Sequence, residues 1–457
     1  MKRLAVILVC LPFVFANAGE KTKTLSLHEA RALVMQRHPR INAADLTVRA
    51  VEEIVRQNRA AYLPQIQGIA AGVITSDATG GVRASTDALQ LAGVYDRASG
   101  SFNVSQLITD FGRTTNLTAS SRLRAEAEAQ NAQTTRAQIL LETDAACFAI
   151  LQARSLLGVA DQTVKTRRLL RDNTVSLQKN QLKSAIDVSF AEVNLQDAEL
   201  LISRTRNDLK SAHATLARLL LDPEGTEYHI TSPTQPVALP SKADGLIQMA
   251  LNLRPELSRL RLERDAAQKF VKAENALSHP RLTLQGTAGT MPWRDRSLDQ
   301  NYAAAGVVLT WPLFTGGLNT ARQNEAELRA QAAEQTLKDQ EATITRDVQL
   351  AWLNATNALE RLNITAKLRE QSAQAYSLAE ARYQAGSSSV VELSQAQLNL
   401  TASEINQTTT RYEYLLRWSI LDFQTGIMVR KSALTFEARD ESSRSKKPVL
   451  GGAKDRH

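Results

Sequence analysis

Ala61-Tyr62-Leu63-Pro64 and Leu277-Ser278-His279-Pro280 close two segments that follow one plan, and this repetition decides the fold. Pro39 and Pro255 lie near the start of the same two segments. The spacing from Pro39 to Pro64 equals the spacing from Pro255 to Pro280. Self-similarity at a fixed spacing is the sequence signature of a repeated structural unit. The two halves of this 457-residue chain are therefore predicted to share one architecture.

A second matched pair lies further along each half. Asp110-Phe111-Gly112-Arg113 is similar to Leu313-Phe314-Thr315-Gly316-Gly317, which pairs Phe111 with Phe314. The stretch from Pro64 to Phe111 is longer than the stretch from Pro280 to Phe314, so the first half has an excess there. Residues 76–99 are rich in Gly, Ser, Thr, Ala and Asp, which is typical of an exposed loop, so we expect the excess in this segment.

Short alternating segments lie between these markers in each half. The alternating apolar positions are Phe102, Val104 and Ile108 in the first half, and Leu282, Leu284, Gly286, Ala288, Ala303, Ala305, Val307, Leu309 and Trp311 in the second. Gln106 interrupts the apolar side, and residues 65–74 alternate poorly. A period of two predicts strands with one apolar and one polar face. We expect strand pairs within residues 65–110 and 281–313.

Two long runs without proline follow the strand pairs. Both are rich in Ala, Leu, Glu, Gln and Arg, with apolar residues recurring at three and four positions, which predicts amphipathic helices. Each run contains a reversal, at Gln181-Leu182-Lys183-Ser184-Ala185 and at Ala385-Gly386-Ser387-Ser388-Ser389. We therefore predict helical hairpins over residues 112–221 and 317–425. Each arm of roughly 60–70 residues would extend about 90–105 Å.

These elements predict five regions along the chain. Lys2 and Arg3, an apolar run and Ala16-Asn17-Ala18 indicate a cleaved signal peptide over residues 1–18. The first repeat covers residues 19–222, each repeat opening with a helix. A proline-rich linker covers residues 223–245, and the second repeat covers residues 246–428. Residues 429–457 form a basic tail that we expect to be disordered.

Charge and residue spacing exclude several function classes. The formal net charge is +8, but Lys2, Arg3 and the tail carry most of it, and the body has interspersed signs, which argues against nucleic acid as a partner. The six histidines have no metal-ligand spacing, and no nucleophile elbow or phosphate-binding loop is present. We expect no enzymatic activity, no cofactor and no metal.

Four strands cannot close a barrel, because about eight are the fewest that do. An open sheet edge in lipid leaves backbone groups unpaired, at several kcal/mol each. Other copies must therefore complete the sheet, and three copies provide twelve strands, an allowed even number. The predicted fold is an α+β membrane protein: a trimeric twelve-stranded β-barrel, with four strands per chain, continued by a long α-helical barrel.

The ordered motifs resemble those of the outer-membrane efflux protein family, the TolC-like proteins, over about Thr24 to Gly426. The residues that carry the resemblance are Leu25-Ser26-Leu27-His28-Glu29-Ala30, His38-Pro39-Arg40-Ile41, Ala60-Ala61-Tyr62-Leu63-Pro64-Gln65, Asp110-Phe111-Gly112-Arg113 and Arg382-Tyr383-Gln384-Ala385-Gly386. The resemblance implies a homotrimer in the bacterial outer membrane with its helical part in the periplasm. It also implies a periplasmic adaptor and an inner-membrane pump as partners.

The resemblance further implies that the helical tips contact the adaptor and form a closable entrance. The family's tip motif is a glycine, a small or hydroxyl residue and an acid, which Gly386, Ser389 and Glu392 match. The first tip has Ser184 and Asp187 but Gln181 in place of the glycine. Lys183 and Arg382 are candidate charged partners at this entrance. The alternative is an ordinary turn glycine, with acids that complement the helix dipole.

Trp293, Tyr302 and Trp311 lie near the predicted strand ends. Amphipathic aromatic rings favour the membrane interface, so these three are candidates for an aromatic belt in contact with outer-membrane lipid. The alternative for each is ordinary packing.

The sequence leaves the cargo open. The favoured function is a channel that passes small molecules, such as drugs and toxic compounds, from an adaptor and pump to the outside. The alternative within the same fold is the outer-membrane component of a type I protein secretion system. Two alternatives of a different class are a periplasmic adaptor and an exported coiled-coil protein, although an adaptor would have one hairpin rather than two.

Overall fold

The computed structural model describes residues 22–74, 81–87, 90–95, 97–223, 226–232, 239–294 and 299–430. The predicted signal peptide and residues 431–457 of the predicted tail lie outside this part. Within it, no helix combines the length and the apolar character needed to cross a membrane. The chain divides into two units, which we call the sheet unit (residues 40–135 and 245–347) and the tip unit (residues 1–39, 136–244 and 348–457).

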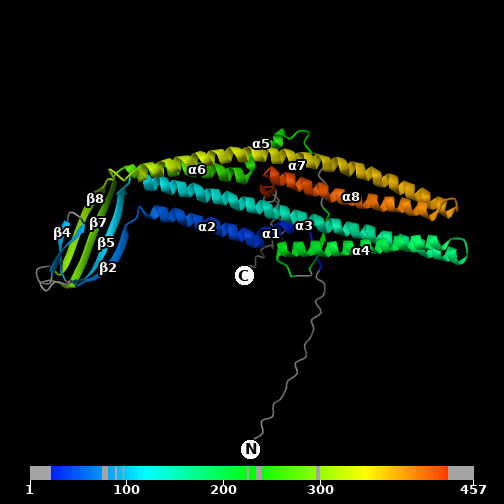
Figure 1. Cartoon of the computed structure of the whole chain (residues 1–457), viewed down its shortest axis with the longest axis horizontal. Helices are drawn as coiled ribbons and strands as arrows, with labels where there is room; N and C mark the ends of the chain where they lie inside the picture. The colour runs from blue at the N-terminus through cyan, green and yellow to red at the C-terminus, as the bar shows by residue number, and fades with distance from the viewer. Residues whose placement is uncertain are drawn as a thin grey trace, which may run out of the picture. The chain divides into compact units, whose positions relative to one another are not determined.

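The sheet unit is built around a four-stranded antiparallel sheet (Figure 1). Its strands, in spatial order, are β2 (Gln65–Val73), β5 (Arg97–Thr109), β7 (Arg281–Trp293) and β8 (Asn301–Thr310). The two central strands come from different halves of the chain, so the sheet joins the two repeats. Strands β2 and β8 are its edges.

Helices lead into and out of these strands. Those that lead in are α2 (Pro39–Ala60) in the first half, and α5 (Asp244–Leu253), α6 (Pro255–Asn275) and the short 3-10 helix η1 (Ala276–Ser278) in the second. Those that leave are α3 (Arg113–Lys179) and α7 (Leu318–Gln384), each of 67 residues. Pro255 occupies the first turn of α6, where a missing N–H breaks no helical hydrogen bond.

The glycine- and serine-rich segment of the first half contains more than the expected loop. Within residues 76–99 the chain forms β3 (Gly81–Asp87) and β4 (Gln90–Tyr95), which pair antiparallel as a separate two-stranded sheet, and the first residues of β5. Composition indicated an exposed connection but not this hairpin, because Gly, Ser and Thr occur in both turns and small hairpins.

The two halves align at the strand-to-helix junction through Gly112 and Gly317, not through Phe111 and Phe314. Gly112 and Gly317 have φ of 97° and 86°, and each directly precedes its long helix. Before them, Phe111 (φ 53°) corresponds to Gly316 (φ 62°). Matching Phe111 with Phe314 was therefore wrong by two positions. The second half instead has a longer apolar connection, residues 311–314, between β8 and its junction.

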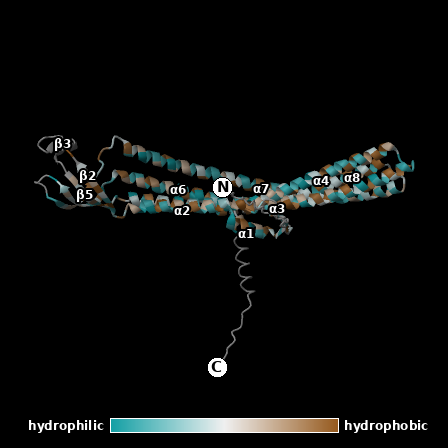
Figure 2. Ribbon diagram, turned by 90° about the horizontal axis from the view of Figure 1, so that it is seen from below, coloured by the Kyte–Doolittle hydropathy of each residue, from teal (hydrophilic) through white to brown (hydrophobic). Residues whose placement is uncertain are grey.

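The tip unit contains α3 from residue 136 and α7 from residue 348, together with the returning arms α4 (Ala185–Leu220) and α8 (Val390–Gln424). The predicted length of roughly 60–70 residues per arm is confirmed for α3 and α7 but wrong for α4 and α8, which have 36 and 35 residues, because each reversal lies nearer the end of its run. Helix α1 (Leu27–Arg37) starts with a capping box in which Ser26 and Glu29 satisfy each other's backbone N–H groups. Strand β1 (Thr22–Leu25) pairs in parallel with β6 (Glu227–Ile230). Apolar and polar residues alternate along the long helices (Figure 2), as amphipathic arms require.

A buried ion pair fixes α1 to α3 in the tip unit. Arg31 donates to both carboxylate oxygens of Asp144, at 2.7 and 2.5 Å, and Asp144 is fully buried. Burial raises the pKa of the neighbouring Cys147 thiol to about 12, so this thiol stays protonated. Removal of one member of a buried pair typically destabilises a protein by about 3–5 kcal/mol. The pair is therefore a structural anchor.

Candidate functional site

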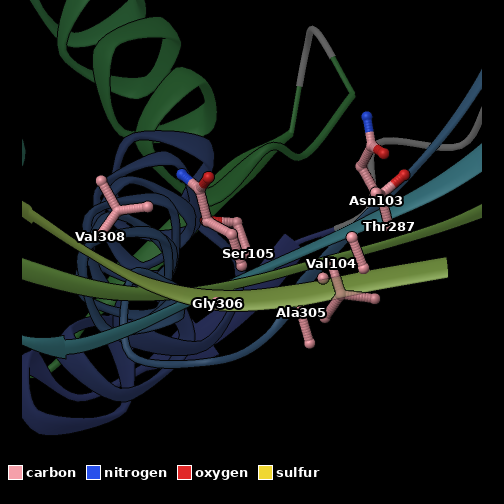
Figure 3. Close-up of a pocket in the computed structure, with 10 residues that line it drawn as sticks. Asn103, Val104, Ser105, Thr287, Ala305, Gly306 and Val308 are labelled. Carbon is pink, nitrogen blue, oxygen red and sulfur yellow. The ribbon is translucent and has the colours of Figure 1, made fainter.

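The register of the sheet places most polar side chains on one face, which also holds Ile69, Leu107 and Val308, and most apolar side chains on the other. One face carries the polar residues Gln65, Gln67, Ser101, Asn103, Ser105, Thr283, Gln285 and Thr287. The other carries Ile66, Phe102, Val104, Leu282, Leu284, Ala288, Ala303, Ala305, Val307 and Leu309. Figure 3 shows Asn103 on one side of the strands and Val104 and Ala305 on the other.

This segregation has an unusual consequence for solvent exposure. On the apolar face Ile66, Phe102 and Val307 are 68%, 67% and 59% exposed, although such residues are usually buried. No described element of the chain covers them. An exposed apolar face opposite a polar one suits a wall between lipid and water.

The interruption of the apolar face by Gln106 has a local cause. Its side-chain amide donates to the backbone carbonyl oxygens of Tyr62, at 2.5 Å, and Leu107, at 3.1 Å. Tyr62 lies in the turn between α2 and β2. Gln106 therefore ties the helix end of β5 to that turn, and its polar group does not point unpaired from the apolar face.

The three candidate interface aromatics lie in different settings. Trp293 ends β7 and is 61% exposed, and Trp311 follows β8, is 57% exposed and donates from Nε1 to the Ser278 carbonyl at 3.3 Å. Tyr302 pairs with Gly289 on the polar face, in line with Ala304 and Thr287. A belt role stays a prediction for the two tryptophans, whereas the register points Tyr302 away from the apolar face.

Both helical tips fold into the same backbone motif. Leu182 N–H donates to the Leu177 carbonyl and Ser387 N–H to the Arg382 carbonyl, both at 2.9 Å. The residues before them, Gln181 and Gly386, have φ of 56° and 73°. This is the Schellman arrangement, which satisfies the last carbonyls of a helix through a left-handed residue. The missing glycine therefore leaves the turn type unchanged.

Matched serines start the returning arms. The Ser184 hydroxyl accepts from the backbone N–H of Asp187 at 3.3 Å, and the Ser389 hydroxyl accepts from Glu392 N–H at 3.2 Å. Each serine is thus the N-cap of its helix. At the first tip Asp187 accepts in return from the Ser184 backbone and hydroxyl groups, and these hydrogen bonds lower the pKa of the Asp187 carboxyl.

The acid of the second tip has different partners. Glu392 forms an ion pair with Arg382 at 2.7 Å, across its own hairpin, and accepts from the Ser388 hydroxyl at 2.7 Å. Arg382 is therefore a partner within one hairpin. Both charged groups are about half exposed, and pairs of this kind contribute little to stability.

Lys183 links the two hairpins of one chain. Its ammonium lies 4.8 Å from the centre of the Tyr383 ring, within the range of a cation–π contact. Further along the arms, Asn194 donates to the Ser394 hydroxyl at 3.3 Å, also between hairpins. Sequence analysis missed Tyr383 in this role, because a contact between residues in different halves of the chain leaves no local pattern.

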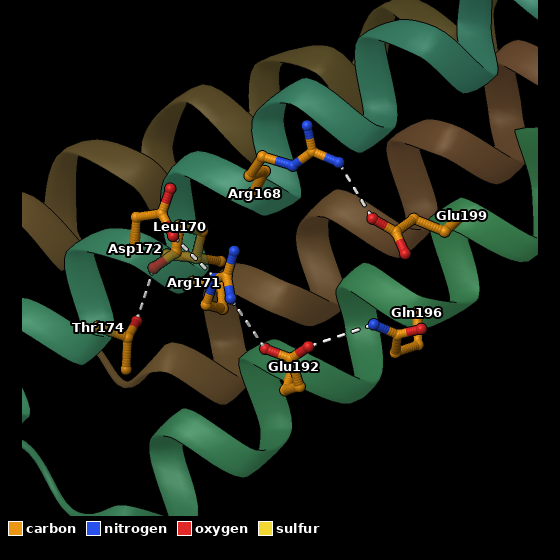
Figure 4. Close-up of polar contacts among 8 residues, drawn as sticks. All are labelled: Arg168, Leu170, Arg171, Asp172, Thr174, Glu192, Gln196 and Glu199. Carbon is orange, nitrogen blue, oxygen red and sulfur yellow. Dashed lines mark hydrogen bonds and ion pairs between the residues drawn. The ribbon is translucent and has the colours of Figure 1, made fainter.

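Charged residues tie α3 to α4 behind the first tip (Figure 4). Arg168 pairs with Glu199 at 3.0 Å and Arg171 with Glu192 at 3.4 Å. Arg167 of α3 is buried and donates to the Asn194 carbonyl of α4 at 2.6 Å, and burial lowers the pKa of its guanidinium. The first hairpin is thus cross-linked by polar contacts along its arms. In the described residues, no three His, Cys, Asp or Glu side chains gather as metal ligands would.

Comparisons with known proteins agree with this architecture. The family model described as outer membrane efflux protein matches residues 31–220 and 246–426. Outer membrane protein TolC of Vibrio cholerae is 24% identical over 83% of this chain and 85% of its own length. Two Pseudomonas aeruginosa relatives match shorter parts: the pyoverdine export outer membrane protein OpmQ, 27% identical over 42% of this chain and 40% of its own, and the alkaline protease secretion protein AprF, 25% over 52% and 50%.

Solved structures show the same fold. The structure of CusC, a transmembrane channel, superimposes with a TM-score of 0.78 over 91% of this chain and 95% of its own, at 18% identity. The outer-membrane channel OprN gives 0.75 over 88% and 89%, at 19% identity. The α+β class predicted from the sequence is confirmed.

Proposed function

Because the chain belongs to the outer membrane efflux protein family, we propose that three copies join their sheets into one channel through which an export system releases its cargo. The family places the chain in the outer membrane, and its named relatives are outer-membrane components of export systems. The observation that carries the proposal is the open four-stranded sheet, with one polar face, one apolar face and two unpaired edges.

The strand directions allow the sheet to close on copies of itself. Neighbouring strands alternate in direction from β2 to β8, so β8 of one copy can pair antiparallel with β2 of the next. Three copies then form a ring of twelve strands, an even number that bacterial barrels use. Closure removes both edges, whose unpaired backbone groups would each cost several kcal/mol in lipid.

The two faces then have separate roles. The apolar face, with Phe102, Val104 and Val307, contacts lipid. The polar face, with Asn103, Gln285 and Thr287, lines the channel with amide and hydroxyl groups. Such groups hydrogen-bond to water and to many solutes without selecting one charge. The barrel wall is therefore a general passage, and selection of cargo falls to the pump and adaptor.

We assign the two tips to the entrance and to contact with a periplasmic adaptor. Gln181 and Ser184 on the first tip, and Gly386 and Ser389 on the second, are exposed in these turns, and Lys183 of the first tip is half-buried. The support is their surface position and the matched Schellman turns, which present two similar backbone loops per chain. An adaptor that binds both loops would contact the backbone conformation that they share and would distinguish the loops by their side chains.

We propose small molecules as the cargo, by analogy with the pyoverdine export relative. A gene deletion tests this in a strain that retains its other export channels. The expected result is increased sensitivity to toxic compounds, restored by the wild-type gene but not by Val307→Lys, which places a charge on the apolar face. Unchanged sensitivity with loss of a secreted protein would instead favour protein secretion, the candidate that the AprF match supports.

A further inference from the structure

A group of large apolar side chains remains exposed where the edge strands meet their helices. Leu313 and Phe314, just after β8, are 81% and 90% exposed. Leu63, just before β2, is 61% exposed. They lie beside the two unpaired edges of the sheet, outside the strands, so they belong to neither the apolar nor the polar face. Their exposure in the single chain therefore requires a separate explanation.

Inside the sheet, one strand-to-helix junction is already packed by side chains of the same chain. Where β5 ends beside the start of β7, the Phe111 ring stacks on the His279 ring, with centroids 6.1 Å apart and an interplanar angle of 23°. Strand β5 leads out to α3, and β7 follows η1. An aromatic ring after an outgoing strand thus packs on the residue that precedes the incoming strand of the other half.

The internal repeat places one member of this arrangement, the residue before the incoming strand, at the edge of the sheet. Leu63 is the repeat counterpart of His279, and each directly precedes the proline before its strand. Phe314 is not the repeat counterpart of Phe111, which is Gly316, but it is the aromatic residue that follows the outgoing strand β8, four residues after the strand ends, whereas Phe111 lies two residues after β5. In an antiparallel pair, the end of β8 lies beside the start of β2. Phe314 of one copy and Leu63 of the next would therefore meet beside the paired edges, as Phe111 and His279 meet within one chain, although the spacing of the aromatic residue after its strand differs.

Within one chain this pair cannot form. Strands β8 and β2 are separated by β7 and β5, so their ends lie roughly 14 Å apart at about 4.8 Å per strand. We propose that Phe314 of one copy packs on Leu63 of the next copy, and that three such contacts seal the barrel where it meets the helices. The inference rests on the proposed trimer and names the residues that join its subunits.

We assign the surface around Phe314 to a second copy rather than to lipid, because the free edge of β8 lies beside it. Strand β8 can gain a partner only along its free edge, and that partner's first residues follow Tyr62-Leu63-Pro64 directly. Phe314 is four residues beyond the end of β8, within reach of that turn. Leu313 and Tyr62 extend the same apolar surface on each side, at 81% and 37% exposure.

Cysteine cross-linking tests the contact in the full chain in its native outer membrane. The variant Leu63→Cys/Phe314→Cys is oxidised and run on a non-reducing denaturing gel. We expect covalent dimers and trimers that reducing agent removes, because a disulfide requires Cα atoms within about 7 Å. A disulfide within one chain would leave the protein at the mass of the monomer. The single variants Leu63→Cys and Phe314→Cys show whether either new cysteine instead cross-links to the buried Cys147.

A matched control uses the far end of the same strand. In Ile74→Cys/Phe314→Cys the first cysteine follows the end of β2, where Ile74 is 81% exposed. About nine residues of strand separate it from the start of β2, roughly 30 Å. We expect no covalent oligomer from this pair. Equal cross-linking of both pairs would overturn the proposal, because it would report random collision.

The outcomes separate the contact from the trimer. A native trimer that does not cross-link through Leu63 and Phe314 overturns the contact while the proposed function stands, and labelling of Phe314→Cys by a lipid-soluble maleimide would then assign the side chain to lipid. A protein that is monomeric in the membrane overturns both. As a second measurement, Phe314→Ser should lower the temperature at which the trimer dissociates on a denaturing gel, and an unchanged temperature contradicts the contact.

Discussion

The two helical tips follow one backbone path with different residues. Gly386 adopts the left-handed conformation of the second tip without steric penalty, whereas Gln181 adopts the same conformation in the first. The junctions after the strands repeat this difference, with Phe111 in the first half and Gly316 in the second. The first half thus places side chains at two left-handed positions where the second has glycine.

This difference shows that the turn geometry belongs to the architecture rather than to glycine. A left-handed residue other than glycine costs roughly 1–2 kcal/mol, so the hairpin and its hydrogen bonds must offset that strain in the first half. At the junction, the Phe111 ring stacks on His279. The two halves therefore share a fold but differ in the backbone strain at these turns.

The largest expected effect tests whether the two halves form one wall. Val104 and Val307 lie on the apolar face in different halves, and we expect Val104→Lys and Val307→Lys to prevent stable insertion equally, at about 2–4 kcal/mol for a lysine near the bilayer midplane. The measurement is the fraction of protein recovered in the outer membrane. Ser105→Lys, on the polar face, is the control, and failure of that variant would contradict the assignment of the faces.

A second effect contrasts the two strand-to-helix junctions. The buried Asp110 carboxylate accepts from Thr114 N–H at 2.9 Å and from its hydroxyl at 2.5 Å. The hydroxyl of its counterpart Thr315 accepts a longer bond from Asn319 N–H, at 3.4 Å, at the surface. We expect Asp110→Ala to destabilise the start of α3 by about 1–2 kcal/mol and Thr315→Ala to cost less. Hydrogen exchange of the first turns measures both, and equal effects would remove the contrast.

The third effect concerns the tips themselves. Gly386→Ala should weaken the second tip by about 1 kcal/mol, because alanine is strained at this φ, and should increase exchange of the Ser387 amide several-fold. Gln181→Gly should relieve strain at the first tip, with a smaller net gain because glycine also frees the unfolded chain. A loss of protection at Leu182 in Gln181→Gly would show that the glutamine side chain stabilises the turn.

The smallest effect is a pH dependence of the first tip. Hydrogen bonds from Ser184 lower the pKa of Asp187, so its stabilising contribution is present above the ordinary aspartate pKa near 4 and is lost as pH falls through the lowered value. Exchange at the start of α4 should therefore increase below about pH 4. Asp187→Asn should remove this dependence, and an unchanged pH profile in that variant would contradict the role of the carboxylate.

The sequence alone predicted the repeats, the strand pairs and the hairpins, because periodicity, proline and glycine mark these elements locally. It missed the register of the junctions, since two phenylalanines suggested an identity that the left-handed pair at Gly316 and Gly317 does not share. It also missed β3 and β4, which have the composition of a loop. The Lys183–Tyr383 contact could not be predicted from the sequence, because it joins residues that are distant in the chain.

The central claim is that one chain supplies a third of a barrel and that its edges pair with sister copies. Native mass spectrometry of the protein extracted from the outer membrane in mild detergent tests it most directly. We expect three chains in every assembly that forms pores in a planar bilayer. A single chain that forms the same pores would contradict the claim.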